Sequence, residues 1–212
     1  MKPVVAAFDF DGTLSAGVSG MRFYRQLLGQ PGYAWLVVRQ FPNLLCYSRR
    51  LRHEQSMAGV TRAVFRGRHA SDVKRAAERF WQTALTPFLE VEPMHRLRQH
   101  LHGGHRCVIV SRGYEMYLRP WAESIGIRDV LATRLEVRSD GKLSGEMTEA
   151  SCDGSVKRER LGALLGSPDE YEVYAYGDGP GDFAMLAMAD HAFIRNGPGF
   201  RPWQPSGQNS CA

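Results

Sequence analysis

The stretch from Val4 to Leu14 limits what this chain can fold into, because a short apolar run there ends in two aspartates. The run from Val4 to Phe8 has no helical period, which indicates a strand buried on both faces in the middle of a parallel sheet. Asp9 and Asp11 follow at its carboxyl end, where ligands bind in open α/β sheets. Their spacing of two directs both side chains to one side. Two carboxylates held together favour a nearby cation, and a divalent metal with oxygen ligands is the simplest candidate.

The composition is that of an ordinary globular protein, with 212 residues of which 43% are hydrophobic and 23% charged. This length suffices for one substantial core and a smaller module. The apolar stretch from Tyr33 to Val38 is too short to span a membrane, and the chain reaches Asp9 before a signal-peptide core could form, so we expect no export. The four cysteines have neither zinc spacing nor a dense disulfide pattern, which favours reduced thiols and a cytoplasmic location.

The net charge of +5 is unevenly distributed along the chain. Residues 19–86 hold 12 Lys and Arg against three acidic residues, a balance of +9. Apolar residues recur there at helical spacing, which predicts about four helices. We expect breaks at Gly29 to Gly32, near Pro42 and around Gly67 to His69, and an end at Pro87. The sequence therefore predicts a basic, all-helical module inserted early in the chain.

After Pro87 the pattern alternates between helix and strand, as in a doubly wound α/β protein. A small hairpin laid on the core is expected around the turn at Ser139 to Gly141, and the tail from Gly197 is expected to be extended or loose. Polar residues follow the strands that we expect, and these are Asp9, Asp11, Ser111 and Asp178. Because the carboxyl ends of parallel strands share one edge of the sheet, these distant residues should meet in one crevice. Lys157, in the first turn of a helix, could also reach this crevice.

Four motifs in order resemble those of the haloacid dehalogenase (HAD) superfamily of phosphohydrolases: Asp9 to Leu14, the strand end at Ser111, Lys157 at a helix start, and Gly177 to Asp182. A helical insertion between the first two motifs is similar to subfamily IB, which includes phosphoserine phosphatases and a bacterial phosphatidylglycerophosphate phosphatase. The resemblance implies a Rossmann-like three-layer core with a parallel sheet over residues 1–17 and 88–212. It also implies a C1-type helical cap over residues 18–87, with hinges near residues 15–20 and 86–90.

The resemblance implies an aspartyl-phosphate mechanism for a phosphomonoester substrate. Asp9 would be the nucleophile, and Asp11 would protonate the leaving oxygen and later activate water. Mg²⁺ would bind Asp9, Asp178 and the backbone carbonyl of Asp11, with Asp182 either a ligand through water or an orienting group. Lys157 would neutralise the negative charge of nucleophile and phosphate.

Phosphoryl oxygens would be held by Ser111 and by the backbone amides of Gly12 and Arg112, again as the resemblance implies. The Arg112 side chain departs from the small residue expected there, and it either contacts phosphate or points to solvent. Four histidines between positions 95 and 105 suggest a metal cluster, but their place on a basic helix and its exit loop favours a surface position.

The substrate is less constrained than the reaction. Phosphoserine phosphatases of this kind place an acidic residue soon after the first motif, whereas residues 12–53 here contain no Asp or Glu. The insert instead interleaves basic and apolar residues: Arg22, Arg25, Arg39, Arg49, Arg50 and Arg52 with Trp35, Leu36, Val37, Phe41, Leu44 and Leu45. We hypothesise a phospholipid or another large anionic phosphomonoester, with transient contact to an anionic membrane surface. Internal packing of these apolar residues is the alternative.

Three further readings remain as alternatives to that hypothesis. A phosphoserine or small-metabolite phosphatase would keep the same chemistry with another substrate. A phospho-accepting signalling domain also uses clustered aspartates, a hydroxyl and a lysine, but its acceptor does not lie in D-x-D on the first strand. A catalytically inactive relative would only bind phospho-ligands. No aromatic and basic motif of an RNA-binding module is present, so we expect no nucleic-acid partner, and the oligomeric state is not predicted.

Overall fold

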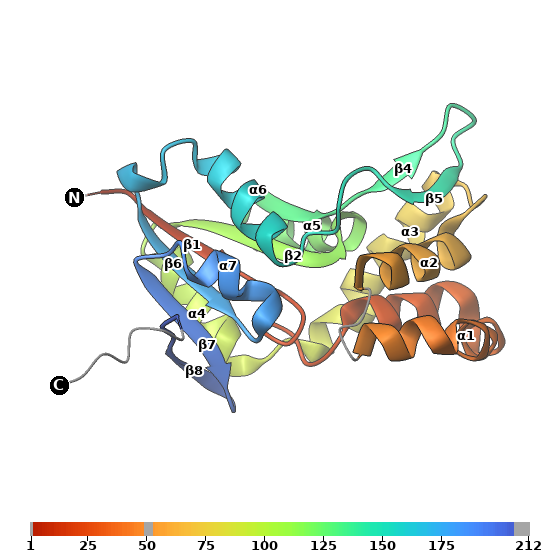
Figure 1. Ribbon diagram of the computed structural model, residues 1–212, viewed down its shortest axis with the longest axis horizontal. Coiled ribbons are helices and arrows are strands. Elements are labelled where there is room, and N and C mark those ends of the chain that lie inside the picture. Colours follow the sequence, from red (N-terminus) through yellow and green to blue (C-terminus); the bar gives the residue numbers. More distant parts are fainter. Residues whose placement is uncertain (1, 49–52, 206–212) are drawn as a thin grey trace.

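A six-stranded sheet forms the centre of the protein in a computed structural model that describes residues 2–48 and 53–205, without the side chains of residues 42–54 (Figure 1). Its strand order is β3-β2-β1-β6-β7-β8. The first five of these strands are parallel, and the edge strand β8 runs antiparallel to β7. The bounds are β1 Val4–Phe8, β2 Arg106–Tyr114, β3 Asp129–Thr133, β6 Glu172–Gly177, β7 His191–Asn196 and β8 Gly199–Pro202.

Strand β1 lies in the middle of the sheet because both of its faces are apolar. Ala6 and Phe8 belong to the core on one face, with α4 (Val91–His102) and α5 (Glu115–Ser124). Val5 and Ala7 belong to the core on the other face, which is formed with α6 (Ser155–Leu165) and α7 (Phe183–Leu186). These four side chains are fully buried, and complete burial of a large apolar side chain contributes about 1.5–3 kcal/mol. The predicted Rossmann-like, three-layer α/β fold is confirmed.

Three helices lie together beyond one end of the sheet, and we call residues 19–80 the helical module (Figure 1). They are α1 (Ser19–Ser48), α2 (His53–Phe65) and α3 (Ala70–Phe80). Gly29 interrupts α1 with a left-handed φ of 68°, as the sequence predicts. The expected break near Pro42 is wrong, because α1 continues to Ser48.

Two short connections join the helical module to the sheet, and they lie side by side. One follows β1, and the other consists of a π-helical turn, η1 (Trp81–Leu85), and a 3-10 turn, η2 (Thr86–Phe88). The Ala16 amide donates to the Phe88 carbonyl at 2.8 Å, and the Glu90 amide donates to the carbonyl of Leu14 at 2.9 Å. Backbone hydrogen bonds therefore fix the point at which the module leaves the sheet.

The predicted hairpin is present as β4 (Leu135–Val137) and β5 (Leu143–Met147), but its expected position on the core is wrong. It lies on the helical module, beside α2 (Figure 1). The Gly67 amide donates to the Leu143 carbonyl at 2.9 Å, and the Leu143 amide donates to the carbonyl of Arg68 at 2.8 Å. The turn between α2 and α3 leaves backbone groups without helical partners, and the hairpin edge satisfies them.

Of the two alternatives for the tail, extended or loose, the first holds at Gly199–Pro202, which pairs with β7 as strand β8.

The surface position expected for the four histidines holds for His95 and His102 but is wrong for His100, which is 6% exposed. Its Nε2 lies 2.8 Å from the Tyr176 hydroxyl and its Nδ1 lies 2.8 Å from Nδ1 of His105. Burial, together with the nearby His105, lowers the pKa of His100 to about 4.

Two of the four cysteines, Cys107 and Cys152, are buried free thiols, whereas the side chains of Cys46 and Cys211 lie outside the described residues. Burial raises the pKa of Cys107 to about 12 and that of Cys152 to about 11. Across residues 2–48 and 53–205, no helix combines the length and apolar character needed to cross a membrane.

Candidate active site

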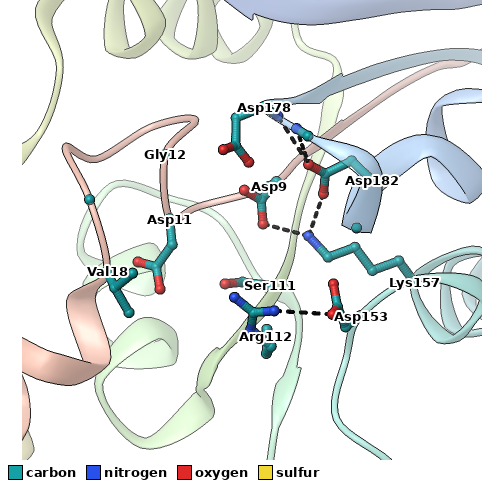
Figure 2. A pocket seen from close by; sticks show the side chains of 13 residues that line it. Asp9, Asp11, Gly12, Val18, Ser111, Arg112, Asp153, Lys157, Asp178 and Asp182 are labelled. Atoms are coloured by element: carbon teal, nitrogen blue, oxygen red, sulfur yellow. Dashed lines mark hydrogen bonds and ion pairs between the residues drawn. The ribbon is translucent and has the colours of Figure 1, made fainter. Parts of the chain in front are cut away.

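Residues from five separate segments line one cavity of about 290 Å³ at the carboxyl edge of the sheet (Figure 2). The segments are the end of β1, residues 17–18 just before α1, strand β2, the start of α6 and the loop after β6. The lining includes every site residue singled out from the sequence, and these are Asp9, Asp11, Gly12, Ser111, Arg112, Lys157, Asp178 and Asp182. The topology brings them together because the carboxyl ends of parallel strands share this edge.

Three carboxylates form the acidic centre of the cavity. One oxygen from each of Asp9, Asp178 and Asp182 lies within 4.8 Å of the others. Gly12 permits this approach, because it has a left-handed φ of 85° and a Cβ at this position would lie 2.5 Å from Asp178 Oδ2. Carboxylate oxygens are the ligands that hard divalent cations prefer, so the donor set fits Mg²⁺.

Lys157 is a buried cation between two of these carboxylates. Its Nζ donates to Asp9 Oδ1 at 2.5 Å and to Asp182 Oδ1 at 2.6 Å, and the residue is only 2% exposed. Burial on its own lowers the pKa of Lys157, but the charges of Asp9 and Asp182 outweigh it and raise that pKa. Lys157 therefore stays protonated and holds both carboxylates in position.

The pKa of Asp9 is raised even though its carboxylate contacts a lysine. Burial is the main cause that raises its pKa to about 8, and the charge of Asp182 adds to it, while Lys157 opposes both. The Thr13 hydroxyl donates to Asp9 Oδ2 at 3.0 Å. One oxygen thus contacts Lys157 and the other contacts Thr13, and this pair of contacts fixes the plane of the carboxylate.

Asp182 organises the loop that follows β6. Its Oδ2 accepts hydrogen bonds from the amides of Asp178 and Gly179 at 3.0 and 3.1 Å, while its Oδ1 faces Lys157. Burial raises the pKa of Asp182, but Lys157 and these amides outweigh burial and lower it. Because both oxygens of Asp182 already contact protein donors, its geometry is that of an orienting group for Asp178.

Asp11 connects the active site to the helical module. The amide of Ser19, the first residue of α1, donates to Asp11 Oδ1 at 2.9 Å. Burial raises the pKa of Asp11, although the hydrogen bonds from Ser19 oppose the change. A carboxyl group with a raised pKa retains its proton more readily, which suits a general acid. Figure 2 shows Asp11 and Val18 on the same side of the cavity.

A hydroxyl and a guanidinium group from β2 also line the cavity. Ser111 is fully buried, and its Oγ accepts from the Gly113 amide at 3.0 Å. Arg112 Nη1 donates to Asp153 Oδ2 at 3.0 Å, and both residues line the cavity (Figure 2). Of the two alternatives for the Arg112 side chain, the structure favours the cavity. Asp153 fits there because Gly181 has no side chain, since a Cβ at Gly181 would lie 2.3 Å from Asp153 Oδ1.

Sequence reasoning missed three residues of the site: Thr13, Ser19 and Asp153. Thr13 lies four residues after Asp9 in the first motif, and membership of that motif could have indicated a place in the site. Ser19 begins the periodic apolar run of α1, and a serine before such a run is typical of a helix start. Asp153 lies in an irregular segment between the hairpin and α6, where no local pattern distinguishes it from other loop aspartates.

Fold and site together define a Rossmann-like α/β enzyme with a carboxylate-rich centre. The model of the haloacid dehalogenase-like hydrolase family matches residues 6–187, and the chain belongs to this family. The resemblance drawn from the four motifs is confirmed.

Curated relatives share most of the chain. It is 30% identical to "Protein CicA" of Caulobacter vibrioides over 194 residues, which cover 92% of this chain and 86% of that protein. It is 28% identical to "Probable phosphatase Rv3661" of Mycobacterium tuberculosis, over 90% of this chain and 68% of the relative.

Solved structures show the same fold. A Bordetella pertussis Tohama I protein of unknown function has a TM-score of 0.77 at 24% identity, covering 88% of this chain and 86% of that one. A substrate-bound phosphoserine phosphatase has a TM-score of 0.65 at 19% identity, covering 92% and 86%. At these identities the likeness concerns the fold.

Proposed function

We propose that this chain is a Mg²⁺-dependent phosphomonoester hydrolase that acts through an aspartyl-phosphate on Asp9. The observation that carries the proposal is the position of Asp9, which contacts the Lys157 cation and has an oxygen within 4.8 Å of two further carboxylates, in one cavity with Asp11 and Ser111. Membership of a hydrolase family and a relative named as a phosphatase support it.

Asp9 and Asp178 would hold Mg²⁺ with the backbone carbonyl of Asp11, and Asp182 would contribute through water while it orients Asp178. When bound, the ion supplies positive charge that offsets the carboxylates and the phosphoryl group. Lys157 supplies a second, permanent positive charge. Without such charge an anionic nucleophile would face a dianionic substrate, and the two would repel each other.

In the first step an Asp9 oxygen bonds to phosphorus while the bond from phosphorus to the leaving oxygen breaks, and Asp11 gives its proton to that oxygen. In the second step Asp11 takes a proton from water, whose oxygen bonds to phosphorus as the bond to Asp9 breaks. Phosphate leaves, and both carboxyl groups return to their initial state. The raised pKa of Asp11 and its hydrogen bond from Ser19 suit this double role.

The phosphoryl oxygens would be held by the Ser111 hydroxyl and by the backbone amides of Gly12 and Arg112. The Arg112 guanidinium adds positive charge at the same wall, where Asp153 fixes its direction. Hydrogen-bond donors that are already oriented stabilise charge in the transition state without further reorganisation. We assign Asp153 a positioning role that acts through Arg112.

We propose that residues 18–87 act as a cap on a core formed by residues 1–17 and 88–212. The two paired connections, with the hydrogen bond from Ala16 to Phe88, support hinges near residues 15–20 and 86–90. The cap would open to admit substrate and close to exclude water. Because Asp11 accepts from the first amide of α1, closure would also place the general acid.

One face of α1 supports contact with an anionic membrane surface, as a peripheral cytoplasmic protein would make. Trp35, Val38 and Phe41 are 59%, 77% and 59% exposed, and the Arg39 guanidinium lies 5.1 Å from the centroid of the Trp35 ring. Aromatic and basic residues on one helix face are typical of interfacial binding. Leu36 does not belong to this face, because it is 1% exposed and packs in the core, as the alternative of internal packing expects. The side chains of Leu44, Leu45, Arg49, Arg50 and Arg52 lie outside the described residues.

Phosphate release with and without Mg²⁺, by wild type and by Asp9→Asn, tests the proposed reaction. We expect metal-dependent release by wild type and none by Asp9→Asn across p-nitrophenyl phosphate, phosphoserine, sugar phosphates and phosphatidylglycerophosphate. Equal release by the variant would refute the nucleophile. A stable, stoichiometric phosphoprotein would instead support a phospho-accepting signalling domain.

A separate experiment, cosedimentation with lipid vesicles, tests the membrane contact. We expect the wild-type protein to sediment with anionic but not with neutral vesicles, and Trp35→Ser to lose this binding.

A further inference from the structure

A second cavity adjoins the active site and enters the helical module. It has about 50 Å³ of free volume and shares Asp11, Val18 and Arg112 with the first cavity. The two cavities therefore meet at the proposed general acid. Since Asp11 must lie next to the leaving oxygen, the organic group attached to that oxygen points toward this second space.

The walls of the second cavity are apolar. Met21 from α1 and Met57 and Val60 from α2 form one side. Tyr114 and Tyr117, from the end of β2 and from α5, form the other. Both the helical module and the rest of the chain contribute to the lining, so this space is complete only when the two are in contact.

The tyrosine hydroxyls of this cavity already have protein partners. The Tyr114 hydroxyl lies 2.5 Å from the Tyr24 hydroxyl and 2.8 Å from Thr61 Oγ1. The Tyr117 hydroxyl lies 2.9 Å from the Ser19 hydroxyl. These pairs use the hydroxyls within the wall, and the rings present their apolar surfaces to the cavity.

Charge is confined to the mouth of this cavity. Among the described residues that line it, the charged side chains are Asp11 and Arg112, both shared with the active site. An ammonium or carboxylate group deep in the cavity would be desolvated without an opposite charge, which is strongly unfavourable. An uncharged apolar group would instead gain free energy by leaving water.

We propose that this cavity is a leaving-group subsite that selects phosphomonoesters of small, uncharged, apolar alcohols, with Met57 and Val60 as specificity-determining residues. The proposal rests on the phosphatase function proposed above. It disfavours phosphoserine, whose ammonium and carboxylate groups have no counterpart here. It also places specificity in the enclosed space beside Asp11 rather than on the exposed face of α1.

A series of alkyl phosphates with wild-type protein tests the subsite directly. From methyl to ethyl to propyl phosphate, kcat/KM should rise about fourfold for each added methylene, as expected for burial in an apolar site. Phosphoethanolamine matches propyl phosphate in chain length but carries an ammonium group, and its kcat/KM should be at least about tenfold lower. A flat series, or a preference for phosphoethanolamine, overturns the proposal.

Two variants locate the effect in this cavity. Met57→Gln adds a polar group, and Gly20→Val fills space, since a Cβ at Gly20 lies at ordinary distances of 3.9 Å from the Tyr117 hydroxyl and 4.0 Å from the Tyr24 ring. Each should lower the propyl-to-methyl ratio of kcat/KM at least about fivefold. Ala63→Gln, on the exposed face of α2, should leave the ratio at the wild-type value.

The outcomes separate the two proposals. If phosphate release depends on Asp9 but kcat/KM is the same for methyl, ethyl and propyl phosphate, the proposed subsite is wrong and the proposed phosphatase function is still supported. No release from any ester by folded wild-type protein overturns both. A wild-type ratio in both cavity variants, each shown to be folded by circular dichroism, overturns the assignment to this cavity even if the alkyl series rises.

Discussion

Replacing Lys157 with methionine should destabilise the metal-free protein strongly. The ammonium group of Lys157 lies 2.5 Å from an Asp9 oxygen and 2.6 Å from an Asp182 oxygen, and these three side chains are 3%, 6% and 4% exposed. Methionine has a similar length but no charge, so the two carboxylates would remain buried without their cation. Breaking a buried ion pair by removing one partner costs about 3–5 kcal/mol of unfolding free energy.

Urea unfolding in EDTA, monitored by circular dichroism, measures this loss, and its pH dependence identifies the cause. In wild type Lys157 lowers the pKa of Asp182, whereas in Lys157→Met burial should raise it above its unfolded value of about 3.9. The folded variant then binds more protons than the unfolded chain, so its stability falls as pH rises. The difference from wild type should be largest at pH 8 and should shrink by at least about half at pH 5.

An exposed lysine provides the matched control. Lys74→Met, on the solvent side of α3, should change the unfolding free energy by less than about 0.5 kcal/mol. A Lys157→Met variant as stable as wild type, or a loss that is the same at pH 5 and pH 8, would refute the electrostatic argument. The phosphatase activity of Lys157→Met with Mg²⁺ should fall by at least about 100-fold, because the positive charge that faces the nucleophile is lost.

Three further predictions concern other parts of the structure. Gly12→Ala should lower Mg²⁺ affinity measured by calorimetry at least about tenfold, because its Cβ would lie 2.5 Å from Asp178 Oδ2; unchanged affinity would contradict the close approach. The pKa of His100 is lowered to about 4, so this residue binds more protons in the unfolded chain below pH 6.5, and it should contribute a loss of about 2 kcal/mol in stability between pH 7 and pH 5, measured by urea unfolding. His100→Phe should lose that part of the slope, and equal slopes would contradict the assignment. Asp153→Ala should remove the carboxylate that orients Arg112 and raise KM about tenfold with a smaller change in kcat; a loss confined to kcat would contradict a positioning role.

Local patterns predicted the elements on which the site depends. The apolar run of β1 has no helical period because both of its faces are buried, and that property can be read without coordinates. Asp9, Ser111 and Asp178 were expected in one crevice because topology places the ends of parallel strands together. Their position around one cavity follows from that rule and from the order of the motifs.

The features that sequence reasoning missed depend on contacts between distant segments. The hairpin lies on the helical module because Gly67 and Arg68 need backbone partners, a need that exists only after α2 and α3 have formed. His100 is buried because Tyr176, on a strand far along the chain, supplies a hydroxyl partner. Asp153 reaches Arg112 only because Gly181 leaves room for it. None of these pairings has a local signature.

The central claim is a covalent aspartyl-phosphate on Asp9, and acid quenching during turnover followed by borohydride reduction and peptide mass spectrometry measures it directly. The proposal predicts that Asp9 alone is phosphorylated and is reduced to homoserine. The label should accumulate in Asp11→Asn with p-nitrophenyl phosphate, whose leaving group needs no proton, because water activation is then impaired. Turnover without any label on Asp9 in either protein, or a label on another residue, would contradict the mechanism.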